Sequence, residues 1–355
     1  MGFHTQISGV SCVLLKILKR RRKKMLNKKN LFLLLSLLLV ISISMVGYGQ
    51  DAVDDWPNRV VRILVPTEPG GGSDTLCRVL APFLAEELDT DVIIENRPGA
   101  GHQVALSLLL NAVPDGYVLS QVNQPNMSMT ILVQDAPYTV DDFAYLNFHH
   151  IDPIAFNVLN DKPWSNFKEL TDYILENPGE IAIGASQASG SYIFMEYLKD
   201  KMGLDFISVP YDGGGPGRAA LLGGHIDVYC ANAFANSRLA EQSKCLGVVW
   251  EERSVIWPEA PTFAEMFNDE EMSEIGTYLA SYRALVIQKE FKEQYPKRWE
   301  KLVQAYKDAY YSEGHMAQSE KIGQLPVMFW VGPEESDRIA AKIHEVIKGY
   351  AHLFK

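Results

Sequence analysis

Cysteine is scarce in this sequence, with four residues in a chain of 355. Cys12 lies in an amino-terminal stretch unlike the rest of the chain, which leaves Cys77, Cys230 and Cys245. An odd number of cysteines excludes a disulfide framework. Three buried thiols are the favoured interpretation, and a single Cys230–Cys245 bridge is the alternative. No cysteine stands directly after the apolar run at 31–46, so the sequence offers no lipid-anchoring site there.

Acidic residues are absent from residues 1–49, which contain nine Lys or Arg. A basic cluster at 19–24 precedes a 16-residue apolar run, 31–46, and small residues follow at Gly47 and Gly49. This order is typical of a secretory signal peptide, and the run is shorter than a membrane span of roughly 20 residues. We predict a cleavable signal peptide over 1–49, translation from Met25 and export to the periplasm. An uncleaved membrane anchor is the alternative.

The rest of the chain lacks excess positive charge. Removing the nine basic residues of the leader changes the formal net charge from −11 to −20. Nucleic-acid binding requires a basic face that neutralises phosphates, so we predict no nucleic-acid partner. The overall charge also repels anions at long range, so an anion site would depend on local donors.

Several motifs of enzymes and cofactor sites are missing. The glycine-rich stretch "GGGSDT" (70–75) lacks both the P-loop lysine and the GxGxxG spacing of dinucleotide sites. The sequence has no GxSxG elbow and no HExxH helix, and His149-His150 are adjacent instead of one helical turn apart. We therefore predict no cofactor, no metal and no catalytic residues.

Strand and helix patterns alternate in two sets. The first set predicts strands at 59–66, 91–96 and 116–122, with helices at 76–84 and 102–112. The second predicts strands at 180–186, 206–211, 225–231 and 245–250, with helices at 167–177, 191–202 and 218–224. A strand at 282–287 and helices through 311 and from 334 to 351 follow. Consecutive β-α-β units imply parallel strands with right-handed crossovers.

Glycine-rich loops connect strands to helices in both sets: "PGGGSD" (69–74), "QASGS" (187–191) and "DGGGPG" (212–217). A loop at a helix N-terminus presents free backbone N–H groups and a partial positive charge, which suit an anion. The alternative is that the glycines only make tight turns. Ligands bind at the carboxyl ends of strands in open α/β sheets, so the three loops are predicted to surround one cleft.

The segments "RVVRILVPTEPGGGSDTLCR", "VIIENRPGAGHQVAL", "PDGYVLS", "NPGEIAIGASQASGS" and "VPYDGGGPGRAALLGGHIDV" resemble the solute-binding receptors of tripartite tricarboxylate transporters, the TctC or Bug family. The resemblance implies a type II periplasmic binding protein fold with two α/β domains around a ligand cleft. It implies a first domain of 50–156 plus 281–355 and a second of 157–280, with crossings near 156–159 and 281–285. The chain would be a monomer that delivers a small organic carboxylate to membrane permease subunits.

The same resemblance implies ligand contacts in both domains. These are Pro69, Gly70, Gly71, Gly72, Ser73, Asp74, Asn123, Asn126, Gln187, Ser189, Gly190, Ser191, Tyr211, Gly213, Gly214, Gly215 and Asn232. Arg283, at the second crossing, is a further candidate partner for a carboxylate, and a salt bridge at the hinge is the alternative.

The sequence departs from the family pattern at Glu68, Asp212 and Ala231. The two added carboxylates either face solvent or pair with an amine on the ligand, which would then be a zwitterion. A sensor that reports ligand to a signalling partner is a further alternative, since it needs the same cleft. An enzyme on this fold would need a pair of titratable side chains near the glycine loops. The candidates for such a pair are Asp74 and the distant Asp227, so an enzyme is disfavoured.

Overall fold

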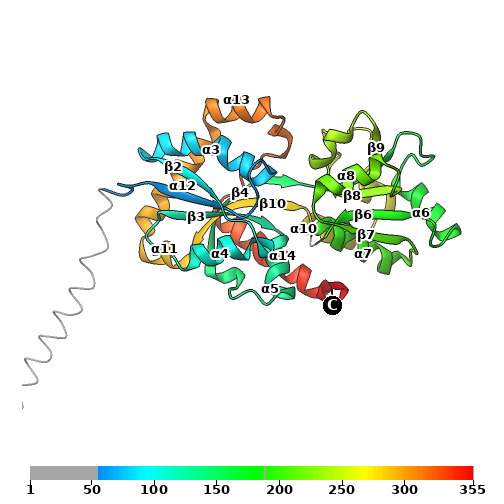
Figure 1. Ribbon diagram of the computed structural model, residues 1–355, viewed down its shortest axis with the longest axis horizontal. Helices are drawn as coiled ribbons and strands as arrows, with labels where there is room; N and C mark the ends of the chain where they lie inside the picture. Colours follow the sequence, from blue (N-terminus) through cyan, green and yellow to red (C-terminus); the bar gives the residue numbers. More distant parts are fainter. Residues whose placement is uncertain (1–54, 188, 355) are drawn as a thin grey trace, which may run out of the picture. The chain divides into compact units, whose positions relative to one another are not determined.

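The computed structural model describes residues 55–187 and 189–354, in which ten strands form two five-stranded sheets (Figure 1). The first sheet has the order β2-β1-β3-β10-β4 and the second the order β7-β6-β8-β5-β9. The strands of the first sheet are β1 (Val61–Val65), β2 (Val92–Asn96), β3 (Val118–Gln124), β4 (Phe143–Asp152) and β10 (Ser281–Gln288). Those of the second are β5 (Ile154–Leu159), β6 (Ala182–Ser186), β7 (Ile207–Tyr211), β8 (Val228–Asn232) and β9 (Ser243–Val249).

Helices cover both sheets. Around the first sheet lie α3 (Gly72–Leu88), α4 (Gln103–Leu110), α5 (Asn126–Val133), α11 (Lys289–Gln294), α12 (Pro296–Tyr311), α13 (Glu313–Lys321) and α14 (Pro333–Tyr350). Around the second lie α6 (Phe167–Glu176), α7 (Gly190–Met202), α8 (Gly214–Leu222), α9 (Phe263–Phe267) and α10 (Glu270–Tyr278). Short 3₁₀ turns are η1 (Ala100–His102), η2 (Val140–Asp142), η3 (Ala235–Leu239), η4 (Leu325–Val327) and η5 (Ala351–Phe354). Residues from Asp55 onward form one compact unit.

The two α/β sets predicted from the sequence are confirmed, since every predicted strand is present within a few residues. The expectation of parallel strands holds for part of each sheet only. β1 pairs in parallel with β2 and β3, and β6 pairs in parallel with β7 and β8. β10 runs antiparallel to β3 and β4, and β5 runs antiparallel to β8 and β9.

Two strands, β4 and β5, were not predicted, and they carry the chain from one sheet to the other. β4 ends at Asp152 in the first sheet and β5 begins at Ile154 in the second, so the chain passes between the sheets at Pro153. The crossing expected near 156–159 therefore falls inside β5. The chain returns at Ser281, the first residue of β10.

Alternating side chains of the first sheet fill two apolar clusters, one on each face. Ile63 and Val65 pack with α3 and α12 in one cluster, whereas Leu64 packs with α4 and α14 in the other. All three side chains are buried, as the period of two in a strand requires when helices cover both faces.

Cys77, Cys230 and Cys245 are free and buried, which confirms the prediction of three thiols. Among the described residues, no helix is both long and apolar enough for a membrane span. The predicted signal peptide, its start at Met25 and its cleavage after Gly49 lie outside the described residues.

Candidate ligand-binding cleft

A cavity of about 800 Å³ is lined by residues from both sets of elements. Its lining comes from the β1–α3 loop, the start of α8, the segment around η3, β10, and the segment between α13 and η4. The residues are Gly70, Gly71, Gly72, Thr75, Gly214, Gly215, Arg218, Phe234, Ala235, Ser237, Arg238, Ile256, Arg283, Ile322, Gly323 and Gln324. The volume is within the range of pockets that hold small molecules.

The glycine loop is shaped by Asp74, whose carboxylate is buried beneath it. Asp74 accepts hydrogen bonds from the Gly70 N–H (2.8 Å), from Arg78 Nε (2.9 Å) and from Asn96 Nδ2 (2.9 Å). Burial acts to raise the pKa of Asp74, but these hydrogen bonds outweigh it and lower the pKa. Asp74 is therefore an ionised structural residue here. The Gly71 N–H bonds to the Glu68 carbonyl (3.3 Å), and the N-terminus of α3 has no side-chain cap.

Arg283 lies beside the start of α3. A Cβ at Gly72 would lie 3.3 Å from both Nη1 and Nη2 of Arg283, so the missing side chain makes room for the guanidinium. Nη1 is 3.1 Å from His150 Nε2, and Nε is buried without a hydrogen-bond partner. Burial lowers the pKa of His150, with a further contribution from Arg283, so this imidazole is neutral and accepts the hydrogen bond.

Two further arginines, Arg218 of α8 and Arg238 of η3, line the cavity from the second set of elements. Arg218 is half-buried and Arg238 is exposed. Burial lowers the pKa of Arg218, and the positive charge of Arg238 lowers it further. Within residues 55–187 and 189–354, no carboxylate lies within ion-pair distance of Arg218, Arg238 or Arg283.

The remaining lining is apolar except for a few groups. Phe234, Ile256 and Ile322 contribute hydrophobic surface. Gln324 is only 4% exposed, and its Oε1 has no hydrogen-bond partner. A buried amide oxygen that lacks a donor costs free energy, about 1–3 kcal/mol.

Six residues named from the sequence line this cavity: Gly70, Gly71, Gly72, Gly214, Gly215 and Arg283. The other twelve do not belong to its lining: Pro69, Ser73, Asp74, Asn123, Asn126, Gln187, Ser189, Gly190, Ser191, Tyr211, Gly213 and Asn232.

Several of these twelve have structural contacts instead. Ser189 caps α7 by accepting a hydrogen bond from the Tyr192 N–H (3.2 Å). Asn232 Nδ2 donates to the Asp152 carbonyl (2.8 Å), and Asn123 Oδ1 accepts from Ser281 Oγ (3.0 Å). The last two bonds lie where the chain changes sheet.

Gly190 has a packing role as well. A Cβ on this residue would lie 1.7 Å from the Leu279 carbonyl oxygen and 3.0 Å from Pro125 Cγ. Only glycine allows the start of α7 to approach those backbone segments so closely. Gly190 was predicted as a ligand contact from its position in the family pattern, and that position does not reveal the packing role.

The sequence reasoning missed Arg218, Arg238, the 234–237 segment and the 322–324 segment. Arg218 is the residue directly after the third glycine loop. In the sequence alone, an arginine at that position is typical of a solvent-exposed charge. The helix α8 also begins at Gly214, whereas the prediction began it at 218. This earlier start places Arg218 one helical turn from Gly214, beside the cleft.

The carboxylates of Glu68 and Asp212 are exposed, and neither residue lines the cavity. The charged residues of the lining are all arginines. The local charge therefore suits an anionic ligand, and an amine would have no acidic partner in the lining.

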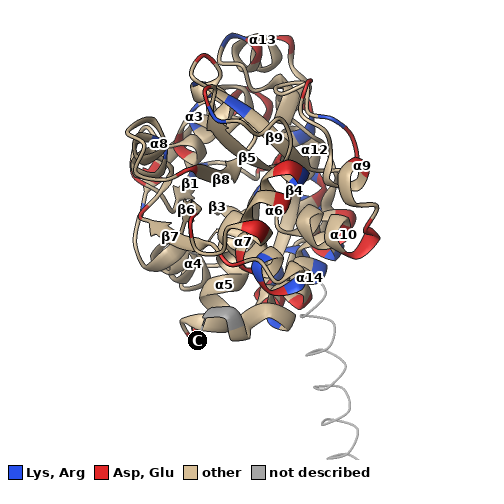
Figure 2. Cartoon of the chain, turned by 90° about the vertical axis from the view of Figure 1, so that its right-hand side faces the viewer, with Lys and Arg blue, Asp and Glu red and all other residues tan. Residues whose placement is uncertain are grey.

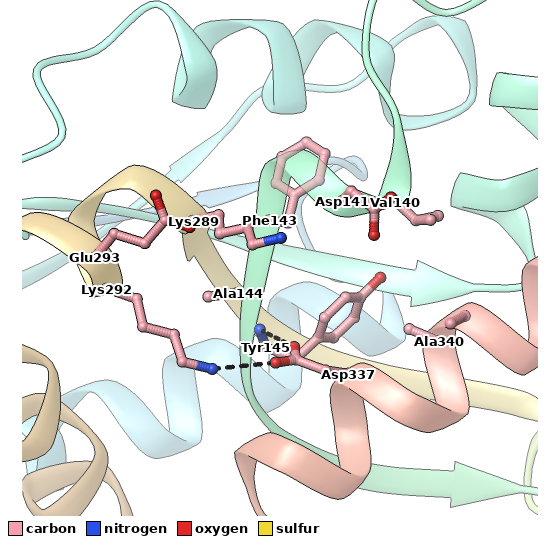
Figure 3. A pocket seen from close by; sticks show the side chains of 11 residues that line it. Val140, Asp141, Phe143, Ala144, Tyr145, Lys289, Lys292, Glu293, Asp337 and Ala340 are labelled. Carbon is pink, nitrogen blue, oxygen red and sulfur yellow. Dashed lines mark hydrogen bonds and ion pairs between the residues drawn. The ribbon is translucent and has the colours of Figure 1, made fainter.

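In two other hollows, some of the charged groups are already paired. In one, of about 190 Å³, Lys292 and the Tyr145 N–H both bond to Asp337 (Figure 3). In the other, of about 330 Å³, acidic residues gather around α10 (Figure 2), but Lys201 pairs with Asp269 and Lys342 with Glu274. No cluster in the described part of the chain has the three His, Cys, Asp or Glu side chains needed for a metal site.

Residues 76–289 match the family described as tripartite tricarboxylate transporter family receptor, and the chain belongs to this family. The family consists of solute-binding receptors and not of enzymes. A UPF0065 protein of Bordetella pertussis is 32% identical over 66% of this chain and 74% of its own length. The predicted family is confirmed.

Solved structures confirm the predicted periplasmic binding protein fold. A TctC solute-binding protein from Polaromonas superposes with a TM-score of 0.70 at 22% identity, covering 84% of this chain and 99% of that chain. A protein from R. palustris solved with adipate superposes with a TM-score of 0.68 at 23% identity. The superposition covers 84% of this chain and 99% of that chain.

Proposed function

We propose that the protein captures a small organic carboxylate outside the cytoplasm and delivers it to the permease subunits of a tripartite tricarboxylate-type transporter. One observation carries the proposal: the cleft is lined by three arginines that have no ion-pair partner among the described residues, next to the uncapped N-terminus of α3. Guanidinium groups and helix N–H groups both favour a carboxylate.

Binding and closure are linked in this proposal. The ligand would contact Gly70–Gly72 and Arg283 on one side, and α8 and η3 on the other. Contacts with both sides are made together only when the cleft is narrow, so the ligand shifts the population toward a closed form. We propose that the units that move are the residues of the first sheet and those of the second, with Pro153 and Ser281 at the crossings. A permease would then recognise the closed monomer.

Family membership and the adipate bound to the R. palustris protein support a carboxylate ligand. The amine-bearing alternative lacks support, because Glu68 and Asp212 are outside the lining.

The test is a calorimetric titration of the protein purified from a host that exports it. The titrants are mono-, di- and tricarboxylates, with amines of similar size for comparison. We expect saturable binding of at least one carboxylate, recovery of that ligand unchanged, and affinity at least about tenfold weaker in Arg283→Gln. Arg338→Gln removes the same charge from an exposed ion pair on α14 and should bind normally.

Binding of amines alone, or chemical conversion of the carboxylate, would contradict the proposal. Delivery is tested separately by deleting the gene in its own host and measuring uptake of the ligand identified by calorimetry. Normal uptake in the deletion strain would argue for a sensory role.

A further inference from the structure

We propose that Asp152 is a positioning residue that links the cleft to a proton, so that the binding of an anion at Arg283 is accompanied by protonation of the Asp152 carboxylate. The proposal rests on the proposed function and adds to it how pH regulates the affinity of the same cleft. Asp152 is the last residue of β4 and is not part of the cavity lining, so it acts on the ligand through its neighbours.

The register of β4 and β10 places Asp152 close to Arg283. His150 of β4 pairs with Arg283 of β10, and Asp152 pairs with Ser281. Residues two apart in a strand point to the same face of the sheet. Asp152 and Arg283 are therefore diagonal neighbours on one face, near enough for their charges to interact. They are nevertheless not an ion pair, since no carboxylate of the described residues lies within 4 Å of Arg283.

The Asp152 carboxylate is fully buried and bonds to the wall of the cleft. Oδ1 accepts from the Phe234 N–H and Oδ2 from the Ala235 N–H, and both of these residues line the cavity. Burial raises the pKa of Asp152 to about 6, although the two hydrogen bonds and the positive charge of Arg283 oppose the change. The ionised form of this carboxylate thus depends in part on the charge of the arginine that faces the ligand.

A bound anion changes this balance in one direction. A carboxylate at Arg283 offsets the positive charge of the guanidinium and adds a negative charge beside Asp152. A like charge nearby disfavours the ionised form of a carboxyl group, so the pKa of Asp152 rises in the complex. The complex therefore draws a proton from the buffer, and by linkage the affinity decreases as the pH rises.

The other titratable groups around Arg283 keep one protonation state between pH 6 and pH 8. Burial lowers the pKa of His149 to about 3 and that of His150 well below 6.5. Burial raises the pKa of Cys77 to about 12 and that of Tyr306, which bonds to His149, well above 10. The arginines of the lining stay protonated throughout this range. Within the described ranges, Asp152 is the neighbour of Arg283 that changes charge there.

The experiment is a calorimetric titration of the exported protein with malate, fumarate and adipate. Each titration is run at pH 6.5 in two buffers with different ionisation enthalpies, because the difference in heat gives the number of protons exchanged. For the probe that binds best, we expect uptake of about half a proton per bound ligand, and an affinity about fivefold weaker at pH 8 than at pH 6.

Two variants identify the group that takes up the proton. Asp152→Asn keeps an acceptor for the Phe234 N–H but cannot titrate, so the uptake should disappear and the affinity should change less than about twofold from pH 6 to pH 8. His225→Gln removes an exposed imidazole beyond the end of α8 and should keep the wild-type uptake. If Asp152 had only a structural role, Asp152→Asn would change the affinity equally at each pH and leave the uptake in place.

Infrared difference spectroscopy of the wild type tests the same point even if Asp152→Asn fails to fold. At pH 7, addition of the ligand should produce the carbonyl band of a protonated side-chain carboxyl, and ¹³C-aspartate labelling should shift that band. Binding without proton uptake, or uptake that persists in Asp152→Asn, would overturn the inference and leave the carboxylate receptor intact. Failure of every carboxylate to bind would overturn both.

Discussion

The carboxylate of Asp152 accepts a 2.8 Å hydrogen bond from the backbone N–H of Phe234. Asp152 is the last residue of β4 in the first sheet, whereas Phe234 lines the cleft beyond β8 of the second. A second bond, from the Ala235 N–H, is 3.3 Å long. The crossing between the sheets is thus tied directly to the wall of the binding cleft.

Asp152 makes stability depend on pH. Burial raises its pKa from 3.8 to about 6, although its hydrogen bonds and Arg283 oppose the change. The folded protein therefore binds this proton more tightly than the unfolded chain does. Its stabilising contribution is complete below about pH 4 and is lost as the pH rises through 6.

Asp152→Asn removes this titration while its side-chain oxygen can still accept from Phe234. The free energy of unfolding of the variant, minus that of the wild type, should increase by roughly 3 kcal/mol between pH 4 and pH 7.5. Urea denaturation at both pH values measures the difference. Taking a difference cancels the opposing titration of the buried histidines, and an unchanged difference would contradict the assignment.

Gly72→Ala should weaken ligand binding with little effect on stability. The new Cβ would press on both Nη atoms of Arg283 at 3.3 Å and displace the guanidinium. We expect carboxylate affinity to fall by about tenfold, equivalent to the loss of one charged hydrogen bond. Gly215→Ala is the matched control, because Gly215 also lines the cavity but has no atom within 4 Å of a Cβ. Similar losses in both variants would show that Arg283 is not responsible.

Gly190→Ala should impair folding. Its Cβ would lie 1.7 Å from the Leu279 carbonyl oxygen, and a backbone atom cannot move aside as a side chain can. We expect a loss of about 3 kcal/mol or more in unfolding free energy, measured by denaturant titration. Gly349→Ala in α14 meets no neighbouring atom and should be neutral or stabilising by up to about 1 kcal/mol. A stable Gly190→Ala protein with lost binding would restore the ligand role expected from the sequence.

The three thiols should be unreactive in the folded protein. Burial raises the pKa of Cys77 and Cys245 to about 12 and raises that of Cys230 as well. Since the thiolate is the reactive form, a thiol reagent should label none of them until the protein unfolds. Reductant should leave the melting temperature unchanged. A shift with reductant would indicate a Cys230–Cys245 bridge, contrary to the structure.

The sequence predicted those strands whose apolar pattern lies within the strand itself. Short apolar runs identified eight of the ten strands of the described residues, but β4 was missed, because it contains Asn147, His149, His150 and Asp152. Their partners come from distant parts of the chain, such as the Val331 N–H on Asn147 and Tyr306 on His149. No pattern within the strand reveals such partners.

The site was predicted only in part for a related reason. Glycines at strand-to-helix turns look alike in the sequence, whether the missing side chain makes room for a guanidinium, as at Gly72, or for a backbone carbonyl, as at Gly190. Arg218 and Arg238 enter the cleft because α8 and η3 are folded against the second sheet. Their charge can be read from the sequence, but their position near each other cannot.

The segment from Ile322 to Gln324 contributes to the cavity wall from outside the family-matched residues 76–289. Its backbone bonds are local, since the N–H groups of Ile322, Gly323 and Gln324 bond to Gln318, Glu320 and Ser319. Neither sheet depends on these side chains for its strand pairing. Evolution or an engineer could therefore exchange this short segment, and alter the shape of the cavity, while the two sheets are inherited unchanged.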